Sequence, residues 1–158
     1  MHVFVNETRP LLQGSRITAW ELSKYGVPHT LITDNMAATF MPKVKAVFVG
    51  ADRITKCGDV ANKIGTHGLA IIARHFGVPF YVCAPTSTIC RHLVEGGEIE
   101  IEQRDKKEVV GMFGRQIAPT TTAVSNPAFD VTPAHLVTKI ITEKGVFGPR
   151  DIAKLDLK

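Results

Sequence analysis

One aspartate in this sequence stands where a general acid or base would be expected. Asp52 directly follows residues 46–51, a run of apolar residues interrupted only by Gly50 and typical of a buried strand. Partial burial at the end of such a strand disfavours the charged carboxylate and raises the pKa of the acid. A carboxylic acid with a raised pKa suits proton transfer near neutral pH. An ion pair with Arg53 or a turn cap would explain the same residue without any chemistry.

An amide and an ammonium group follow a short polar loop. Asn62 and Lys63 are expected to open a helix over residues 60–76. Backbone N–H groups at a helix start attract anions, and an adjacent ammonium strengthens that attraction. The pair therefore predicts a phosphate-binding position, and a capping asparagine beside a solvated lysine is the alternative. Gln13 and Arg9 would reach the same pocket from a neighbouring strand end, or would be ordinary polar residues of a turn.

The elements that must position these groups alternate between strand and helix patterns. Strands are expected at residues 3–6, 30–33, 46–51 and 80–84, with helices over 14–24, 36–41 and 60–76 between them. This order predicts the α/β class, a Rossmann-like open, mainly parallel sheet with helices on both faces. Ligands of such sheets bind outside the carboxyl ends of the strands. Polar residues follow every expected strand, at 7–9 with 13–14, at 33–36, at 50–53 and at 84–87.

The second half of the chain is less regular. Residues 98–102 alternate between acidic and apolar types and predict a half-exposed strand. Residues 111–125 are expected to form a loop with short extended pieces. Residues 133–141, with Pro133 in the first turn, predict a helix. We therefore expect one Rossmann-like domain over residues 1–149 and a polar, loosely held tail over 150–158.

Composition excludes several classes of partner. The chain has 158 residues, 44% hydrophobic and 22% charged, as expected for one folded domain. Its net charge is +4, and acidic residues interrupt the densest basic cluster, at Arg104, Lys106 and Lys107. That mixture indicates a solvated loop and not a nucleic-acid surface. No apolar run approaches the roughly 20 residues of a membrane span. No glycine-rich dinucleotide motif follows a strand, so we expect no nucleic-acid, membrane or dinucleotide partner.

The cysteines indicate a reducing compartment. Cys57, Cys83 and Cys90 lack the spacing of a zinc site, and their odd number argues against a disulfide framework. We therefore expect no metal and a cytoplasmic location. Cys57, in the polar loop after Asp52, is the one thiol placed to be reactive, and an inert thiol is the alternative. The chain begins directly in a strand pattern without a signal peptide, so we expect a domain taken from a longer parent.

Ordered motifs along the chain resemble the methylthioribose-1-phosphate isomerases, over nearly all of residues 3–149. The matching segments are 7–10, 13–14, 31–37, 49–54, 58–66, 79–82, 117–119, 126–133 and 141–146. The wider superfamily also holds ribose-1,5-bisphosphate isomerases and noncatalytic regulatory subunits of the eukaryotic initiation-factor exchange complex. Asp52 and the Asn62–Lys63 pair favour the sugar-phosphate isomerases over those regulatory subunits.

The resemblance implies conversion of an aldose 1-phosphate to a ketose 1-phosphate in methionine salvage. In the family pattern Asp52 matches the catalytic acid or base, and Gln13, Asn62 and Lys63 match substrate-binding positions. Hydrogen moves from C2 to C1 by a hydride shift or through an enolate, and the residues leave both routes open. The resemblance implies no cofactor, a homodimer formed through this domain, and a cytoplasmic location that in a eukaryote would extend to the nucleus.

One departure from the family pattern limits the expected activity. The family's catalytic cysteine, its amino-terminal helical domain and its phosphate-binding arginines lie upstream of the first strand expected here. Cys57, Cys83 and Cys90 do not match that cysteine's segment. We therefore expect this polypeptide by itself to be inactive or nearly so. A regulatory binding module and a ribose-1,5-bisphosphate isomerase remain the alternative functions.

Overall fold

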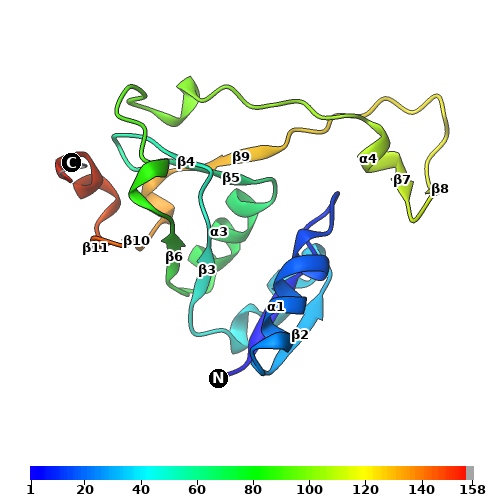
Figure 1. Cartoon of the computed structure of the whole chain (residues 1–158), viewed down its shortest axis with the longest axis horizontal. Coiled ribbons are helices and arrows are strands. Elements are labelled where there is room, and N and C mark those ends of the chain that lie inside the picture. The colour runs from blue at the N-terminus through cyan, green and yellow to red at the C-terminus, as the bar shows by residue number, and fades with distance from the viewer. Residues whose placement is uncertain (156–158) are drawn as a thin grey trace. The chain divides into compact units, whose positions relative to one another are not determined.

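The computed structural model describes residues 1–155, which form two compact units (Figure 1). The first unit comprises Met1–Phe40 and Glu102–Ala128, and the second comprises Met41–Ile101 with the chain from Phe129 onward. Both units combine helices with strands, and parallel strand pairs occur in each. The mixed α/β class with parallel strands predicted from the sequence is therefore confirmed.

The first unit is built on two parallel strands joined by a helical crossover. Strand β1 (Val3–Asn6) pairs with β2 (His29–Ile32), and the register runs from Val3 opposite His29 to Asn6 opposite Ile32. A π-helical turn (Gly14–Thr18) and α1 (Ala19–Lys24) connect them, as predicted. Gly14 is required there, because a Cβ at this position would collide with the Asn6 carbonyl oxygen. The close approach holds the start of the crossover against the end of β1.

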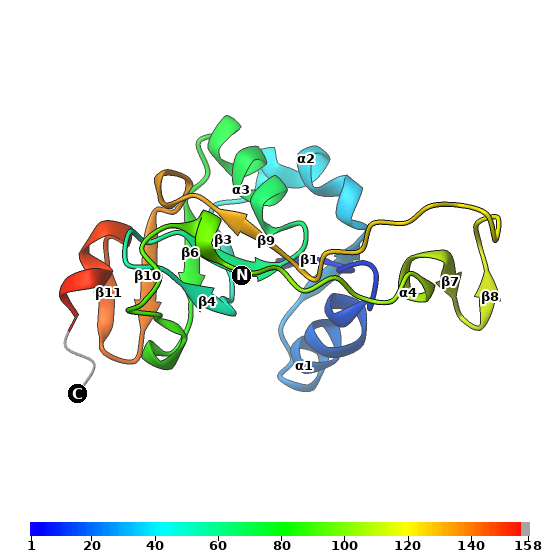
Figure 2. The same cartoon turned by 90° about the horizontal axis from the view of Figure 1, so that it is seen from above.

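Two short segments complete the first unit. A 3-10 turn (Asp34–Met36) and α2 (Ala37–Phe40) follow β2. Later in the chain come α4 (Lys107–Val110), β7 (Gly111–Met112) and β8 (Arg115–Gln116), which Figure 2 shows in succession. The Arg104 guanidinium donates to the Glu108 carboxylate at 2.7 Å and ties the base of this segment. The prediction of a loop with short extended pieces over residues 111–125 is confirmed.

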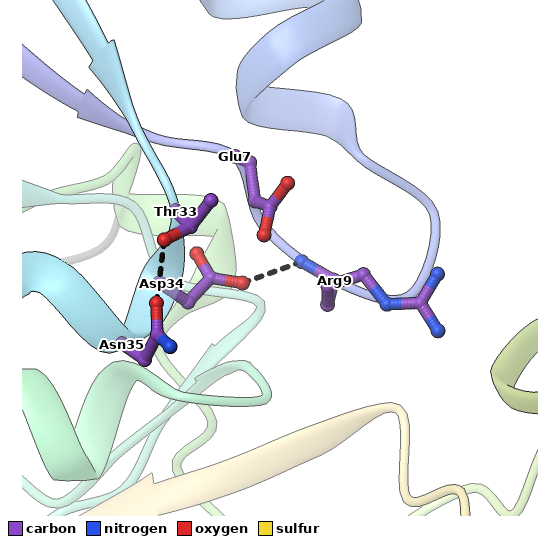
Figure 3. A pocket seen from close by; sticks show the side chains of 5 residues that line it. All are labelled: Glu7, Arg9, Thr33, Asp34 and Asn35. Atoms are coloured by element: carbon purple, nitrogen blue, oxygen red, sulfur yellow. Dashed lines mark hydrogen bonds between the residues drawn. The ribbon is translucent and has the colours of Figure 1, made fainter.

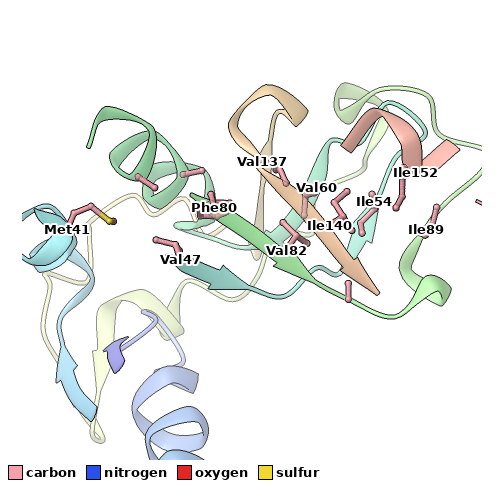
Figure 4. Close-up of a cluster of buried hydrophobic side chains, with 13 residues drawn as sticks. Met41, Val47, Ile54, Val60, Phe80, Val82, Ile89, Val137, Ile140 and Ile152 are labelled. Carbon is pink, nitrogen blue, oxygen red and sulfur yellow. The ribbon is translucent and has the colours of Figure 1, made fainter. Parts of the chain in front are cut away.

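The second unit holds a four-stranded sheet with the order β11-β10-β6-β3. Its parallel members are β3 (Val47–Val49), β6 (Phe80–Cys83) and β10 (Lys139–Thr142), and β11 (Gly145–Phe147) is antiparallel to β10. Helix α3 (Thr66–His75) buries Ala70 and Ala73 in the same cluster as Phe80 and Val82 (Figure 4). Small residues on the helix allow this close packing against the sheet.

The carboxy-terminal turn belongs to that core. Residues Pro149–Lys154 form a 3-10 turn, within which Ile152 is 1% exposed. Another 3-10 turn, Met41–Lys43, begins this unit. The prediction of a loosely held tail is therefore wrong up to Lys154, because Ile152 supplies apolar surface that the core buries. Residues 156–158, which the predicted tail also included, lie outside the described part of the chain.

A second, antiparallel sheet of this unit corrects two predictions. It consists of β4 (Arg53–Ile54), β5 (Val60–Lys63) and β9 (Phe129–Thr132). The helix predicted over residues 60–76 begins only at Thr66, because Val60 and Ala61 are buried in a strand between β4 and β9. Left-handed Gly65, at φ +102°, separates the strand from the helix.

Two later predictions are also wrong. The helix expected over residues 133–141 is a 3-10 turn (Ala134–Leu136) followed by β10. Its β-branched residues Val137, Ile140 and Ile141 suit a strand, and their spacing imitates a helix face. The strand expected over residues 98–102 is absent among the described residues. Gly96–Glu98 form a 3-10 turn instead, with a capping box between Glu95 and Glu98.

Within residues 1–155 no helix is both long enough and apolar enough to cross a bilayer.

Candidate functional site in the two units

Asp52 lies at the open end of the β4–β5 hairpin. Its backbone N–H donates to the Ala61 carbonyl at 2.9 Å, so the residue faces β5 just before β4 begins. Among residues 1–155 no hydrogen bond or ion pair engages its carboxylate, and neither the predicted alternative of a pair with Arg53 nor a turn cap is formed. Although Asp52 is exposed, neighbouring protein desolvates the carboxyl and raises its pKa, while the Lys63 charge lowers it in part. The acid is unpaired and its pKa is shifted as the sequence predicted.

Asn62 and Lys63 end β5 beside Asp52. The Asn62 amide donates to the Thr66 hydroxyl at 3.0 Å, and that hydroxyl donates to the Lys63 carbonyl at 2.6 Å. The Lys63 ammonium lies 5.5 Å from the centre of the Phe129 ring, across the β5–β9 pair. A Cβ built on Gly50 would lie 3.8 Å from the Asn62 amide oxygen. Asp52, Asn62 and Lys63 are therefore held together within the second unit.

The start of α3 does not form the predicted anion cradle. The prediction that Asn62 and Lys63 open this helix is wrong, because both lie in β5. The Asp130 carboxylate accepts the backbone N–H of Gly65 at 2.7 Å and that of His67 at 3.0 Å. Burial nevertheless raises the pKa of Asp130, and the two amides only reduce that effect. Asp130 thus already occupies two of the amides at the helix start, and we expect an anion near Lys63 to be held mainly by the ammonium and amide side chains.

Gln13 belongs to the first unit. It stands between Leu12, whose φ is +56°, and Gly14 at the start of the crossover. The side-chain oxygen of Gln13 is buried, and no described residue donates a hydrogen bond to it. An unsatisfied buried acceptor is costly to a fold unless a partner binds it. This is the observation that supports a ligand-binding role for Gln13.

A cavity of about 380 Å³ in the first unit is lined by residues of segments 7–9 and 33–36, the polar segments expected after two of the predicted strands. It lies at the carboxyl ends of β1 and β2 (Figure 3). The lining residues are Glu7, Arg9, Thr33, Asp34 and Asn35. The Asp34 carboxylate accepts the backbone N–H of Thr8 at 2.8 Å and that of Arg9 at 2.7 Å, which fixes one wall. The rule that ligands bind beyond the carboxyl ends of parallel strands predicts a binding position at these two segments.

Asp59 closes the other end of the β4–β5 hairpin, a role that no pattern in the sequence predicted. Its carboxylate accepts the backbone N–H of Gly96 at 2.9 Å and that of Ala134 at 2.8 Å. Burial alone would raise the pKa of Asp59, but these two amides, with the Cys57 thiol, lower it overall. The carboxylate therefore ties together three segments distant in sequence. The only local signal is an aspartate after glycine, which is common in turns.

The described residues hold no group of three or more His, Cys, Asp or Glu side chains arranged for a metal ion. Cys57, Cys83 and Cys90 are free thiols. Within residues 1–155, the chemistry available at the Asp52 end of the hairpin is therefore that of a carboxylic acid, an amide and an ammonium group.

Comparison with known proteins confirms the resemblance noted in the sequence. The methylthioribose-1-phosphate isomerase of Chloroflexus aurantiacus is 57% identical over 98% of this chain and 45% of its own length. The 5-deoxyribose 1-phosphate isomerase of Moorella thermoacetica is 59% identical over 98% of this chain and 46% of its own. The chain thus spans about half the length of these relatives.

Solved structures agree on the fold. The crystal structure of 5-methylthioribose 1-phosphate isomerase from Pyrococcus horikoshii superposes with a TM-score of 0.93 at 48% identity. That match covers 97% of this chain and 44% of the other. A family model described as the initiation factor 2 subunit family matches residues 1–149. The chain belongs to the initiation factor 2 subunit family.

Proposed function

We propose that this chain supplies the Asp52 half of a sugar-phosphate isomerase site, which converts methylthioribose 1-phosphate to methylthioribulose 1-phosphate in methionine salvage. The observation that carries the proposal is the unpaired Asp52 carboxyl, with its raised pKa, beside Asn62 and Lys63. The names of its relatives support the same reaction class. Gln13, with its unsatisfied buried oxygen, is proposed as a further substrate contact.

Asp52 is proposed to act as the acid that opens the sugar ring. The bond between C1 and the ring oxygen breaks while the ring oxygen takes the Asp52 proton. Hydrogen then moves from C2 to C1, and the C2 hydroxyl loses its proton to become the ketone, which returns a proton to Asp52. The phosphate stays on C1 throughout. A raised pKa leaves Asp52 protonated to a higher pH than an ordinary aspartate, which is the direction that this first step requires.

Lys63 and Asn62 are proposed to bind the phosphate. An ammonium group is a strong donor to phosphate oxygens, and a positive charge close to Asp52 also limits how far the pKa of that acid rises. Asn62 uses one of its amide hydrogens on Thr66, which orients the side chain and leaves the other for a ligand.

The proposal includes a homodimer and a cytoplasmic location. On the four-stranded sheet, Phe48 is 62% exposed and stacks on Tyr81 at 5.2 Å between ring centres. Val146, on β11, is 61% exposed. In the proposed homodimer the second copy would cover the exposed Phe48–Tyr81 stack. Three free thiols suit a reducing cytoplasm, and in a eukaryotic cell the nucleus as well.

A regulatory binding module is the second candidate. The family model that matches residues 1–149 is described by an initiation-factor subunit and not by an enzyme. A ribose-1,5-bisphosphate isomerase would use the same acid on a substrate with a second phosphate. Measuring whether ribose 1,5-bisphosphate or methylthioribose 1-phosphate binds more tightly at Lys63 would distinguish these two enzymes.

Two assays test the proposal. The isolated chain is expected to form ketose at least about a thousandfold more slowly than the Chloroflexus aurantiacus relative, because it spans only 45% of that enzyme. A chimaera in which this chain replaces the matched part of that relative is expected to restore turnover. A folded chimaera that binds the sugar phosphate without converting it would favour the regulatory module. Rapid turnover by the isolated chain would contradict the proposal that this chain supplies only part of the active site.

A further inference from the structure

The Thr66 hydroxyl, at the first residue of α3, contacts both members of the Asn62–Lys63 pair. It accepts a hydrogen bond from the Asn62 amide nitrogen at 3.0 Å and donates one to the Lys63 carbonyl at 2.6 Å. Thr66 is 6% exposed, so little water competes for either bond. A local bond between a side chain and the backbone is common at a helix start and would stabilise the turn without any effect on a ligand.

The single proton of this hydroxyl decides how the Asn62 amide is turned. A hydroxyl has one hydrogen to donate, and the Lys63 carbonyl, which can only accept, receives it. The group of Asn62 that faces Thr66 must therefore be a donor, which is the amide nitrogen and not the oxygen. The amide oxygen lies on the side of Gly50, where an added Cβ would be 3.8 Å from it.

Asp130 holds the backbone of Thr66 from both sides. Its carboxylate accepts the N–H of Gly65 at 2.7 Å and that of His67 at 3.0 Å, the residues immediately before and after Thr66. Asp130 is also the partner of Asn62 in the register of β5 and β9. The hydroxyl is therefore fixed relative to the strand pair that carries the Asn62 amide.

We infer that Thr66 is a positioning residue of the proposed site, which commits the Asn62 amide to one orientation and ties it to the backbone of Lys63. This inference rests on the proposed phosphate contact of Asn62 and Lys63. Without the hydroxyl, the amide would be free to turn its oxygen toward a bound anion, and binding would have to freeze that rotation. Thr66 removes both costs in advance and needs no contact with the ligand.

The orientation is tested without a ligand, by NMR of the Asn62 side-chain amide in the whole chain. Thr66→Val removes the acceptor and is expected to move the Asn62 amide proton resonances toward those of a solvated amide. Thr66→Ser keeps a hydroxyl and is expected to retain the resonances of the parent. Thr138→Val is the matched control, because it removes a hydroxyl that accepts the Phe80 N–H at 2.9 Å at the amino end of β6. Unchanged Asn62 resonances in Thr66→Val would overturn the inference.

Titration with inorganic phosphate tests the consequence for binding. Thr66→Val is expected to bind phosphate about tenfold more weakly than the parent, the loss that follows removal of one oriented hydrogen bond. Thr66→Ser is expected to stay within about twofold of the parent, because its hydroxyl makes the same two bonds. Thr138→Val is expected to bind as the parent does, and the melting temperatures of both valine variants show whether the compared proteins are folded.

Failure of this inference is distinguishable from failure of the proposed function. Equal phosphate binding by the parent and Thr66→Val would remove the positioning role of Thr66 and leave the phosphate contact standing. Phosphate that perturbs neither Asn62 nor Lys63 in the parent would contradict the proposed phosphate contact and the role of Thr66 with it. An Asp52→Asn chimaera that turns over normally would contradict the proposed acid and leave the phosphate titration unaffected.

Discussion

Asp52 and Asp59 stand at opposite ends of one short hairpin and have opposite surroundings. At the loop end, the Asp59 carboxylate accepts backbone N–H groups from Gly96 and Ala134, and its pKa is lowered. At the open end, the Asp52 carboxylate has no hydrogen-bond partner among residues 1–155, and its pKa is raised. The strands between them are the same two, β4 and β5.

The difference separates a carboxylate that the fold uses, Asp59, from one that the described fold leaves unpaired, Asp52, for the proposed chemistry. Amides aimed at Asp59 stabilise its charged form, so this residue contributes most to the fold when it is ionised. Nothing in the described fold stabilises ionised Asp52 except the Lys63 charge, so the residue costs stability and keeps its proton longer. Asp59 holds the loop end of the hairpin in place, and the Asp52 carboxyl at the other end has no hydrogen-bond partner in the described fold. A positioned acid needs both a rigid support and an available carboxyl group.

The largest expected effect is on catalysis. Asp52→Asn in the chimaera is expected to lower ketose formation by about 10²–10⁴-fold, the usual contribution of a general acid or base. Its melting temperature is expected to stay unchanged or to rise, because an unpaired carboxylate is removed. Glu100→Gln, at an exposed residue of the second unit, is the control and is expected to keep full turnover. An Asp52→Asn chimaera as active as the parent would abolish the distinction between the two ends.

The next effect is on stability. Asp59→Asn is expected to lower the free energy of unfolding by about 1–3 kcal/mol, since an amide cannot accept both backbone N–H groups as strongly as a carboxylate. Urea unfolding measures it. The control is Asp151→Asn, which removes an exposed pair with Lys154 and is expected to change stability by less than about 1 kcal/mol. Equal losses in both variants would show that Asp59 ties nothing together.

Asp52 and Asp59 should make the free energy of unfolding depend on pH in opposite directions, because their pKa values are shifted in opposite directions. The pKa of folded Asp59 lies below its unfolded value, so its contribution is present above about pH 4 and is lost as the pH falls through the folded pKa. The stability gap between the parent and Asp59→Asn should therefore narrow with acidification. For Asp52 the folded pKa is raised, so stability is favoured below the unfolded pKa and declines as the pH rises through the folded one. A gap for Asp59→Asn that widens in acid would reverse this assignment.

The smallest effect concerns the coupling of Asp52 to Lys63. Lys63→Met is expected to raise the pKa of Asp52 further, because the Lys63 ammonium in the parent protein favours the ionised form of the acid. Carbon-13 NMR titration of the aspartate carboxyls measures it. Lys139→Met, an exposed change on β10, should leave the Asp52 titration in place. A fall in the pKa after Lys63→Met would mean that burial at Asp52 is relieved and not that a charge is lost.

Parts of the site were predictable because they depend on local sequence. An apolar run that ends in a polar residue predicts a buried strand and the residue at its carboxyl end, which placed Asp52 correctly. The strand at Val3–Asn6 and the crossover that starts at Gly14 followed from equally local patterns. The cavity beyond β1 and β2 is lined by residues of segments 7–9 and 33–36, which the same strand-end rule picks out from the sequence.

The sequence by itself determined the chemical groups, the strand end that precedes Asp52 and the α/β class. Only the tertiary structure decided that residues 60–63 form a strand, because β4 and β9 bury Val60 and Ala61 between them. Only it placed the Asp130 carboxylate, 65 residues from Gly65, over the amides that begin α3. Periodicity reports which face of a segment is apolar, but it carries no information about which distant segment will cover that face or satisfy its backbone groups.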